Sequence, residues 1–136
     1  MVEINAIYEG DLRSTATHGP SGAVLQTDAP VDNHGKGESY SPTDLLATAL
    51  GTCMMTIMGI YANGRDLDIK GTSVKVFKEM TPEAPRRISK LTTEINVPLP
   101  ADSEHIAGLE KAALSCPVHL SLHPDIEKPI TWNWVG

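Results

Sequence analysis

The chain has 136 residues, a formal net charge of −6 and only 4% aromatic residues. This length suits one domain, whose core must come from aliphatic, alanine and methionine side chains without disulfide or metal support. The 11 Lys and Arg residues are scattered along an acidic chain, which argues against partners such as nucleic acid or an anionic membrane. We therefore expect a single domain over residues 1–136.

The first predicted elements are three strands and a long loop. Three segments combine β-forming residues with alternation: residues 2–8, 12–18 and 23–27. Residues 28–40 have the composition of a loop, rich in Gly, Asp and Asn. Within this loop we interpret Asp28, Asp32 and Glu38 as turn and solvent residues. A loop of this length in a small domain is often functional.

A long helix is predicted to begin at Pro42. Ser41 can cap it, Pro42 suits its first position, and Asp44 provides the acid of a capping box. Asn63 and Gly64 are typical of a helix end. The spacing of one helix face is shared by Leu46, Leu50, Cys53, Ile57 and Ile60. We expect this face to pack on the core.

The same helix is apolar on nearly every side, because Met54, Met55 and Met58 extend its apolar surface. Such a helix should be buried nearly all round. A sheet covers only one face, so a second chain must cover another, which predicts a homodimer. Its threonines make the segment too polar and too short for a transmembrane helix. The N-terminus lacks signal-peptide features, so we expect a cytosolic protein.

The second half of the chain is predicted to add three strands and two helices. The five segments are residues 68–80, 86–99, 101–116, 117–124 and 129–135. The first two form a hairpin with Lys75 and Lys78 pointing outward. Asp102 or Ser103 caps the next helix, and Pro117 ends it. This order of elements indicates an α+β domain, with helices segregated against antiparallel sheet.

Two cysteines are the candidate reactive residues. Cys116 would cap the short helix that follows it, where free N–H groups favour a thiolate. Cys53 lies about three turns inside its helix, so an outside cation must support its thiolate. Arg13, Arg86 and Arg87 are the available sources of that charge. These arguments rank Cys116 as the more thiolate-like, although free cysteines are mostly buried and inert.

Both cysteines lie on apolar helix faces that must share one small core. If the two thiols meet, one can become a sulfenic acid on reaction with a peroxide, and the other can resolve it as a disulfide. Apolar walls around them would select an apolar hydroperoxide. A competing interpretation is a metal site of Cys116, His119 and His123, for which a fourth ligand is missing.

The segments "SPTDLLATALGTCMMTIM" and "LEKAALSCPVHLSL" together resemble the OsmC/Ohr family of osmotically inducible and organic-hydroperoxide-resistance proteins. The resemblance covers essentially the whole chain. It implies an OsmC-like α+β fold, an intertwined homodimer whose antiparallel sheets wrap around central buried helices. It places the peroxidatic cysteine at Cys53 and the resolving cysteine at Cys116, which reverses the ranking above. It also implies organic hydroperoxide substrates, a dithiol reductant of the dihydrolipoamide type, and no cofactor.

The sequence departs from this family at two positions. In Ohr-type members an Arg in the N-terminal turn and a Glu just after the helix Pro support the thiolate. Pro20 and Thr43 stand at those places. We predict that Arg13 and Glu38, the nearest Arg and Glu on either side, replace the missing pair. The resemblance thus predicts a thiol-dependent peroxidase. The alternative is a non-enzymatic dimer that binds a small apolar ligand.

Overall fold

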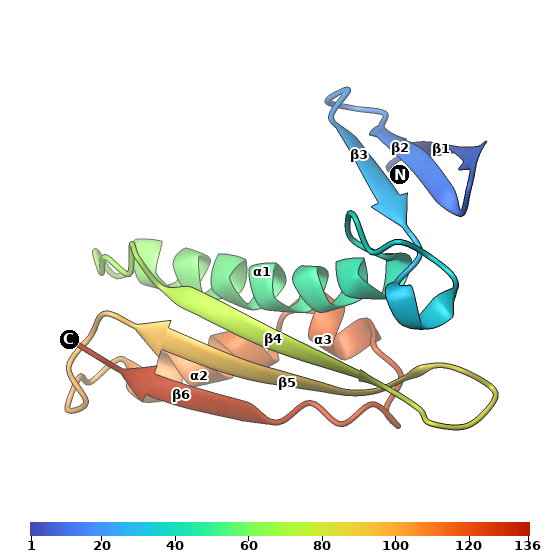
Figure 1. Ribbon diagram of the computed structural model, residues 1–136. Helices are drawn as coiled ribbons and strands as arrows, with labels where there is room; N and C mark the ends of the chain where they lie inside the picture. Colours follow the sequence, from blue (N-terminus) through green and yellow to red (C-terminus); the bar gives the residue numbers. More distant parts are fainter. The chain divides into compact units, whose positions relative to one another are not determined.

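The computed structural model describes residues 1–136, which form two compact units, Met1–Leu46 and Ala47–Gly136. The N-terminal unit contains an antiparallel sheet in the order β1–β2–β3, coloured blue in Figure 1. Its elements are β1 (Ile4–Gly10), β2 (Arg13–His18), β3 (Val24–Asp28) and the 3-10 helix η1 (Val31–Asn33). The three predicted strands and the loop after them are confirmed.

Helix α1 (Pro42–Asn63) begins and ends where the sequence predicts. The Ser41 hydroxyl accepts a hydrogen bond from the Asp44 N–H at 3.1 Å, and the Asp44 carboxylate accepts one from the Ser41 N–H at 2.9 Å. These two reciprocal bonds satisfy N–H groups that the helix itself leaves unpaired. The predicted capping box is therefore confirmed.

The buried face of α1 differs from the predicted one. The buried residues are Ala47, Leu50, Gly51, Met54, Met58 and Ala62. Leu46 and Ile60, which we expected on the buried face, are 44% and 63% exposed. The lack of a side chain at Gly51 lets α1 pack closely on β4. A Cβ at this position would lie 3.0 Å from methyl groups of both Val74 and Val76. These exposed faces of α1 in the single chain are the ones for which the sequence analysis predicts cover by a second chain.

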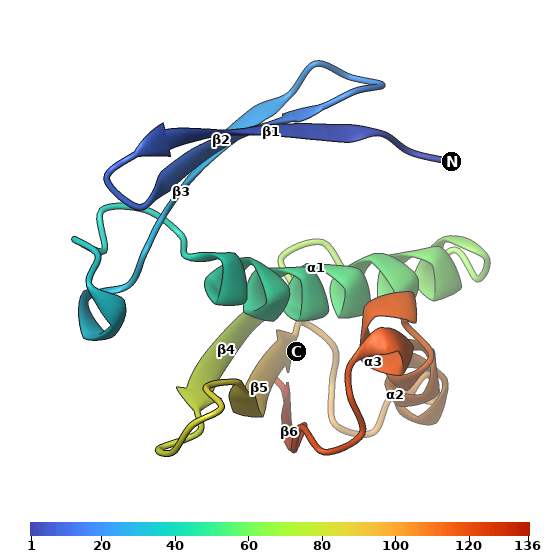
Figure 2. The same cartoon turned by 90° about the vertical axis from the view of Figure 1, so that its right-hand side faces the viewer.

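The C-terminal unit is a three-stranded sheet in the order β4–β5–β6 with helices on one face (Figures 1 and 2). Its further elements are β4 (Ser73–Met80), β5 (Ile88–Val97), α2 (Ile106–Leu114), α3 (Pro117–Ser121) and β6 (Ile130–Trp134). The predicted hairpin of β4 and β5 is confirmed. The pairing of β6 with β5 is parallel rather than antiparallel, because α2 and α3 form a crossover between them.

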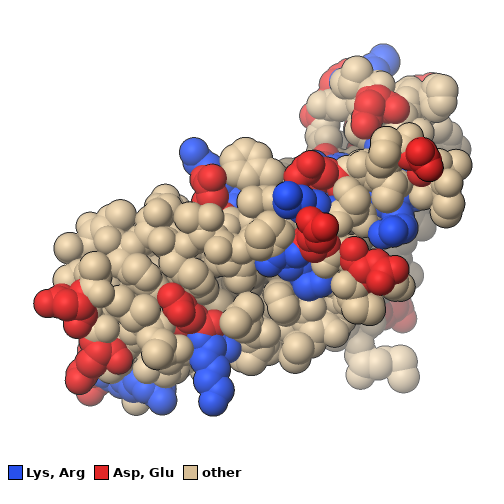
Figure 3. All heavy atoms as spheres, turned by 90° about the horizontal axis from the view of Figure 1, so that it is seen from below, with Lys and Arg blue, Asp and Glu red and all other residues tan.

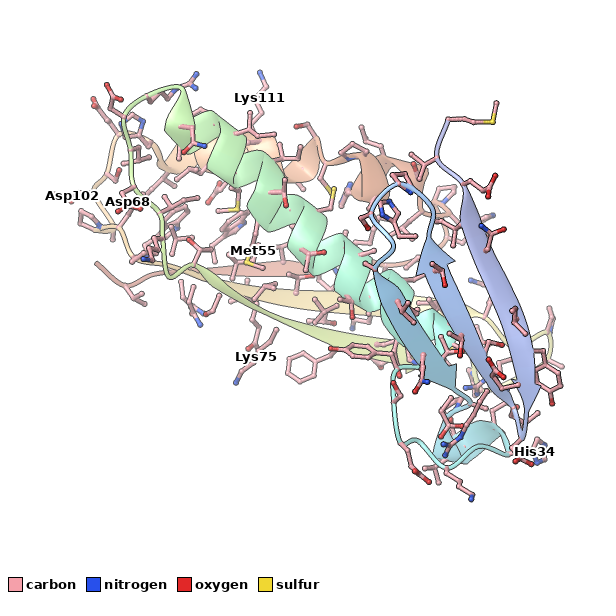
Figure 4. The ribbon with its side chains drawn as sticks, turned by 90° about the horizontal axis from the view of Figure 1, so that it is seen from above. His34, Met55, Asp68, Lys75, Asp102 and Lys111 are labelled. Atoms are coloured by element: carbon pink, nitrogen blue, oxygen red, sulfur yellow. The ribbon has the colours of Figure 1, made fainter.

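Two details of these elements correct the sequence analysis. Lys75 is exposed and projects from β4 (Figure 4), but Lys78 lies on the other side of the strand, which is half-buried. Residues three apart on a strand point to opposite faces, so both lysines cannot face outward. Helix α2 begins at Ile106, and its N-cap is His105 without a side-chain hydrogen bond, so neither Asp102 nor Ser103 caps it.

The hydrophobic core lies between α1, the sheet and α2 in the C-terminal unit. Fully buried members are Leu50, Met54, Met58, Leu91, Ile95, Val97, Leu109, Ala113 and Cys116. By length and composition α1 could also cross a membrane, so our expectation that this segment is too short and too polar is wrong. Core helices of soluble proteins meet the same criteria, and α1 packs on a sheet.

Candidate functional site

Cys53 and Cys116 lie together in the core of the C-terminal unit. Helix α1 holds Cys53 half-buried against the core cluster, and Cys116 is fully buried at the junction of α2 and α3. The side chain of Cys53 interacts with the thiol of Cys116, and both cysteines are free. The prediction that the two helices bring their cysteines into one core is confirmed.

Cys116 caps α3, as the sequence predicts, but this does not make it the more acidic thiol. Its sulfur accepts a hydrogen bond from the His119 N–H at 3.2 Å. Burial nevertheless raises the pKa of Cys116, and the hydrogen bond and charge of Cys53 raise it further, against the backbone N–H groups of His119 and Val118. Cys116 therefore keeps its proton. Capping alone therefore does not make Cys116 the more thiolate-like of the two cysteines.

Arg13 and Glu38 form an ion pair within the N-terminal unit. Arg13 opens β2 and lies directly opposite Asp28, the last residue of β3. Its Nη2 is 3.1 Å from Glu38 Oε1 and 3.4 Å from Asp28 Oδ2. The Glu38 N–H donates to the same Asp28 oxygen at 3.0 Å, which ties the 28–40 loop back to the sheet. The Arg13 guanidinium thus forms ion pairs with the carboxylates of both Asp28 and Glu38.

Asp28 is the residue that the sequence analysis missed. It is only 2% exposed, whereas we had interpreted it as a solvent-facing turn residue. Its second oxygen, Oδ1, is buried without a hydrogen-bond partner. A polar cavity of about 350 Å³ adjoins this cluster and is lined by Glu9, Arg13, Asp28, Glu38 and neighbouring hydroxyl groups. One signal was available in the sequence. Oppositely charged residues stand at adjacent strand ends, Arg13 at the start of β2 and Asp28 at the end of β3.

The metal site of the competing interpretation is not formed. No group of three or more His, Cys, Asp or Glu side chains is placed to hold a metal ion. His123 is exposed and faces Asp125 at 3.8 Å, while the Nδ1 of His119 is buried without a partner. The interpretation of Cys116, His119 and His123 as ligands is therefore wrong. The sequence analysis also considered Arg87 as a cation for Cys53. Arg87 lies at the β4–β5 hairpin, where it donates a hydrogen bond to the Ile88 carbonyl at 3.5 Å.

Solved structures share this fold over almost the whole chain. A Psychrobacter arcticus protein named for osmotic stress induction and a detoxification response is 45% identical, with 97% and 96% of the two chains covered and a TM-score of 0.90. An organic hydroperoxide resistance protein OsmC from Legionella pneumophila is 16% identical, with 98% and 96% covered and a TM-score of 0.78. An OsmC-like protein from Mycoplasma pneumoniae is 15% identical, with 100% and 98% covered and a TM-score of 0.82.

The search of curated proteins gave no match. The family model described as OsmC-like protein matches residues 35–130, a span that contains both cysteines. The match includes the second part of the loop before α1 and nearly all of the C-terminal unit. Together with the 45% identical structure, it shows that this chain belongs to the OsmC family.

Proposed function

We propose that the protein is a thiol-dependent peroxidase that reduces organic hydroperoxides through Cys53 and Cys116. The observation that carries the proposal is the contact between the two thiols. Proteins with the same fold are named organic hydroperoxide resistance proteins, from Legionella pneumophila and Elizabethkingia anophelis. A cytosolic location, which keeps thiols reduced between turnovers, is part of the proposal.

The proposed reaction has three steps. The Cys53 thiolate attacks the outer oxygen of the hydroperoxide, the O–O bond breaks, and an alcohol leaves after it takes a proton. Cys116 then attacks the resulting Cys53 sulfenic acid, which releases water and leaves a Cys53–Cys116 disulfide. A dithiol such as a dihydrolipoamide reduces this disulfide and becomes oxidised itself. No cofactor takes part.

The two cysteines suit different steps because their surroundings differ. Cys53 is partly exposed and can be reached by a substrate, whereas Cys116 is fully buried. A buried, protonated Cys116 competes poorly for peroxide, since the thiolate is the nucleophile.

We propose that Arg13 and Glu38 act together to support the Cys53 thiolate. Their 3.1 Å ion pair is consistent with one functional unit in place of the family pair that Pro20 and Thr43 replace. Asp28 also engages Arg13, so the guanidinium is held by two carboxylates. Its net effect on a thiolate is therefore smaller than that of an arginine paired with one acid.

We propose that the protein acts as a homodimer. No residue of the N-terminal unit belongs to the hydrophobic core, and its sheet exposes large apolar side chains. These side chains are Ile4, Ile7, Tyr8, Val24 and Leu25. Three exposed strands need apolar cover to be stable. On the face in Figure 3, basic and acidic groups are intermixed and separated by uncharged residues.

The double engagement of Arg13 favours one alternative, a dimer that binds a small apolar ligand without peroxidase activity. Steady-state turnover separates the two functions. The protein with a dihydrolipoamide-type dithiol should consume cumene hydroperoxide, and Cys53→Ser should abolish consumption. Cys116→Ser should still give one turnover per site, measured as peroxide loss before the reductant is added. Wild-type protein that consumes no peroxide would leave only the ligand-binding alternative.

A further inference from the structure

The polar cavity of about 350 Å³ beside Arg13 and Asp28 lies within the N-terminal unit, where β2 and β3 are paired. Three consecutive cross-strand pairs line it, from Arg13 with Asp28 to Thr15 with Gln26. Every residue of the lining is charged or carries a hydroxyl or an amide group. The cavity therefore suits a ligand that is rich in hydrogen-bonding groups.

Hydrogen bonds between β3 and the loop before α1 hold the walls of this cavity. The Glu38 N–H donates to Asp28 Oδ2 at 3.0 Å, and the Ser39 hydroxyl donates to the Gln26 carbonyl at 3.0 Å. The Asp28 N–H donates to the Tyr40 carbonyl, also at 3.0 Å. Lining residues of the strand and of the loop are thus fixed before a ligand arrives, which lowers the entropy cost of binding.

The lining carries an excess of negative charge and a carboxylate oxygen without a partner. Glu9, Asp28 and Glu38 supply three carboxylates, whereas Arg13 is the one basic residue of the lining. Arg13 Nη2 lies 3.4 Å from Asp28 Oδ2, but Oδ1 of the same carboxylate is buried without a hydrogen bond. Asp28 is only 2% exposed. An unpaired acceptor on a buried charged group is costly, so a ligand that brings a positive charge and N–H donors is favoured.

We propose that this cavity binds a small organic cation through a primary ammonium group, with Asp28 as the main binding residue. An ammonium group has three N–H donors and no acceptor, so it can meet carboxylate and hydroxyl oxygens together. A metal ion fits less well, because no group of three or more His, Cys, Asp or Glu side chains is placed to hold one. The cavity contains neither cysteine, so the site does not depend on the proposed peroxidase activity.

The test is a calorimetric titration of the full chain, without peroxide or dithiol, with four ligands that share a butane chain and differ in charge. Diaminobutane should bind most tightly and butylamine more weakly, whereas the neutral butanediol and the anion succinate should not bind. The affinity for diaminobutane should fall as the salt concentration rises, because salt screens the charges. In NMR spectra, diaminobutane should shift the amide signals of Thr15 and Gln26, which line the cavity.

Variants that remove one negative charge locate the site. Asp28→Asn keeps the shape of the side chain and should weaken the binding of diaminobutane about tenfold or more. Glu9→Gln, at an exposed position, should weaken it roughly two- to fivefold, and it carries the test if circular dichroism shows that Asp28→Asn is unfolded. Glu3→Gln makes the same charge change outside the cavity and should leave the affinity unchanged.

Three results would each overturn the proposal. The first is that diaminobutane does not bind the wild-type protein at millimolar concentrations. The second is that butanediol or succinate binds as tightly as diaminobutane, since the charge of the ligand would then not matter. The third is that Glu9→Gln changes the affinity no more than Glu3→Gln does.

Discussion

The side chain of Cys53 interacts with the thiol of Cys116, and this interaction joins α1 to the junction of α2 and α3. The two cysteines are distant in sequence, so only the packed core brings them together. Burial and the neighbouring Cys53 raise the pKa of Cys116. The proposed peroxidase chemistry depends on it.

Stability should fall at alkaline pH because of Cys116. Its pKa is raised in the folded state by burial and by Cys53. The stabilising contribution is complete below the ordinary thiol pKa of about 8.5 and is lost as pH rises through the raised value. Within that window the free energy of unfolding should fall by up to ~1.4 kcal/mol per pH unit.

Urea unfolding of the wild type and of Cys116→Ala, at neutral pH and at about one unit above the ordinary thiol pKa, measures this effect. The alanine variant is less stable throughout but should lack the alkaline loss due to Cys116. Equal pH dependence in the two proteins would contradict the assignment of a raised pKa.

Arg13 should matter more for stability than Glu38, although the two form one ion pair. Arg13→Gln leaves the carboxylate of Asp28 buried and without its cation, which should cost roughly 3 kcal/mol. Glu38 is 58% exposed, so Glu38→Gln should cost less than about 1 kcal/mol. Chemical unfolding of both variants, with Asp28→Asn as a third, gives the comparison. A larger loss in Glu38→Gln would show that Asp28 does not depend on Arg13.

The order of the elements could be read from the sequence, because strong local signals mark them. Ser41, Pro42 and Asp44 fix the start of α1, and alternation identifies β5 with Leu91 and Ile95 buried. These signals depend on only a few neighbouring residues, so they can be recognised without knowledge of the tertiary structure.

The buried face of α1 could not be read in this way. The helix is apolar on most sides, so periodicity does not choose between faces, and the close approach of Gly51 to Val74 and Val76 decides it. Asp28 was missed for a related reason. Its partner Arg13 is set by cross-strand register, which the residues of β3 alone do not specify.

His119 should titrate below the normal range of histidine. Burial lowers its pKa, and the charge of Lys128 lowers it further. The neutral ring therefore contributes stability above the ordinary pKa of about 6.5, and this contribution is lost as pH falls below that value. Lys128→Met should move the NMR titration of the His119 ring to higher pH, while Lys75→Met, on the exposed side of β4, should leave it in place. Equal titrations in both variants would contradict the influence of Lys128.

The most direct test of the peroxidase account is to map the disulfide formed by a single addition of peroxide. Reduced protein is mixed with one equivalent of cumene hydroperoxide, alkylated, digested without reductant and analysed by mass spectrometry. The account predicts a peptide that links Cys53 to Cys116 within one chain, and a dimedone adduct on Cys53 in the Cys116→Ser variant. Recovery of both cysteines as alkylated thiols, or of an adduct on Cys116 in Cys53→Ser at the wild-type rate, would contradict it.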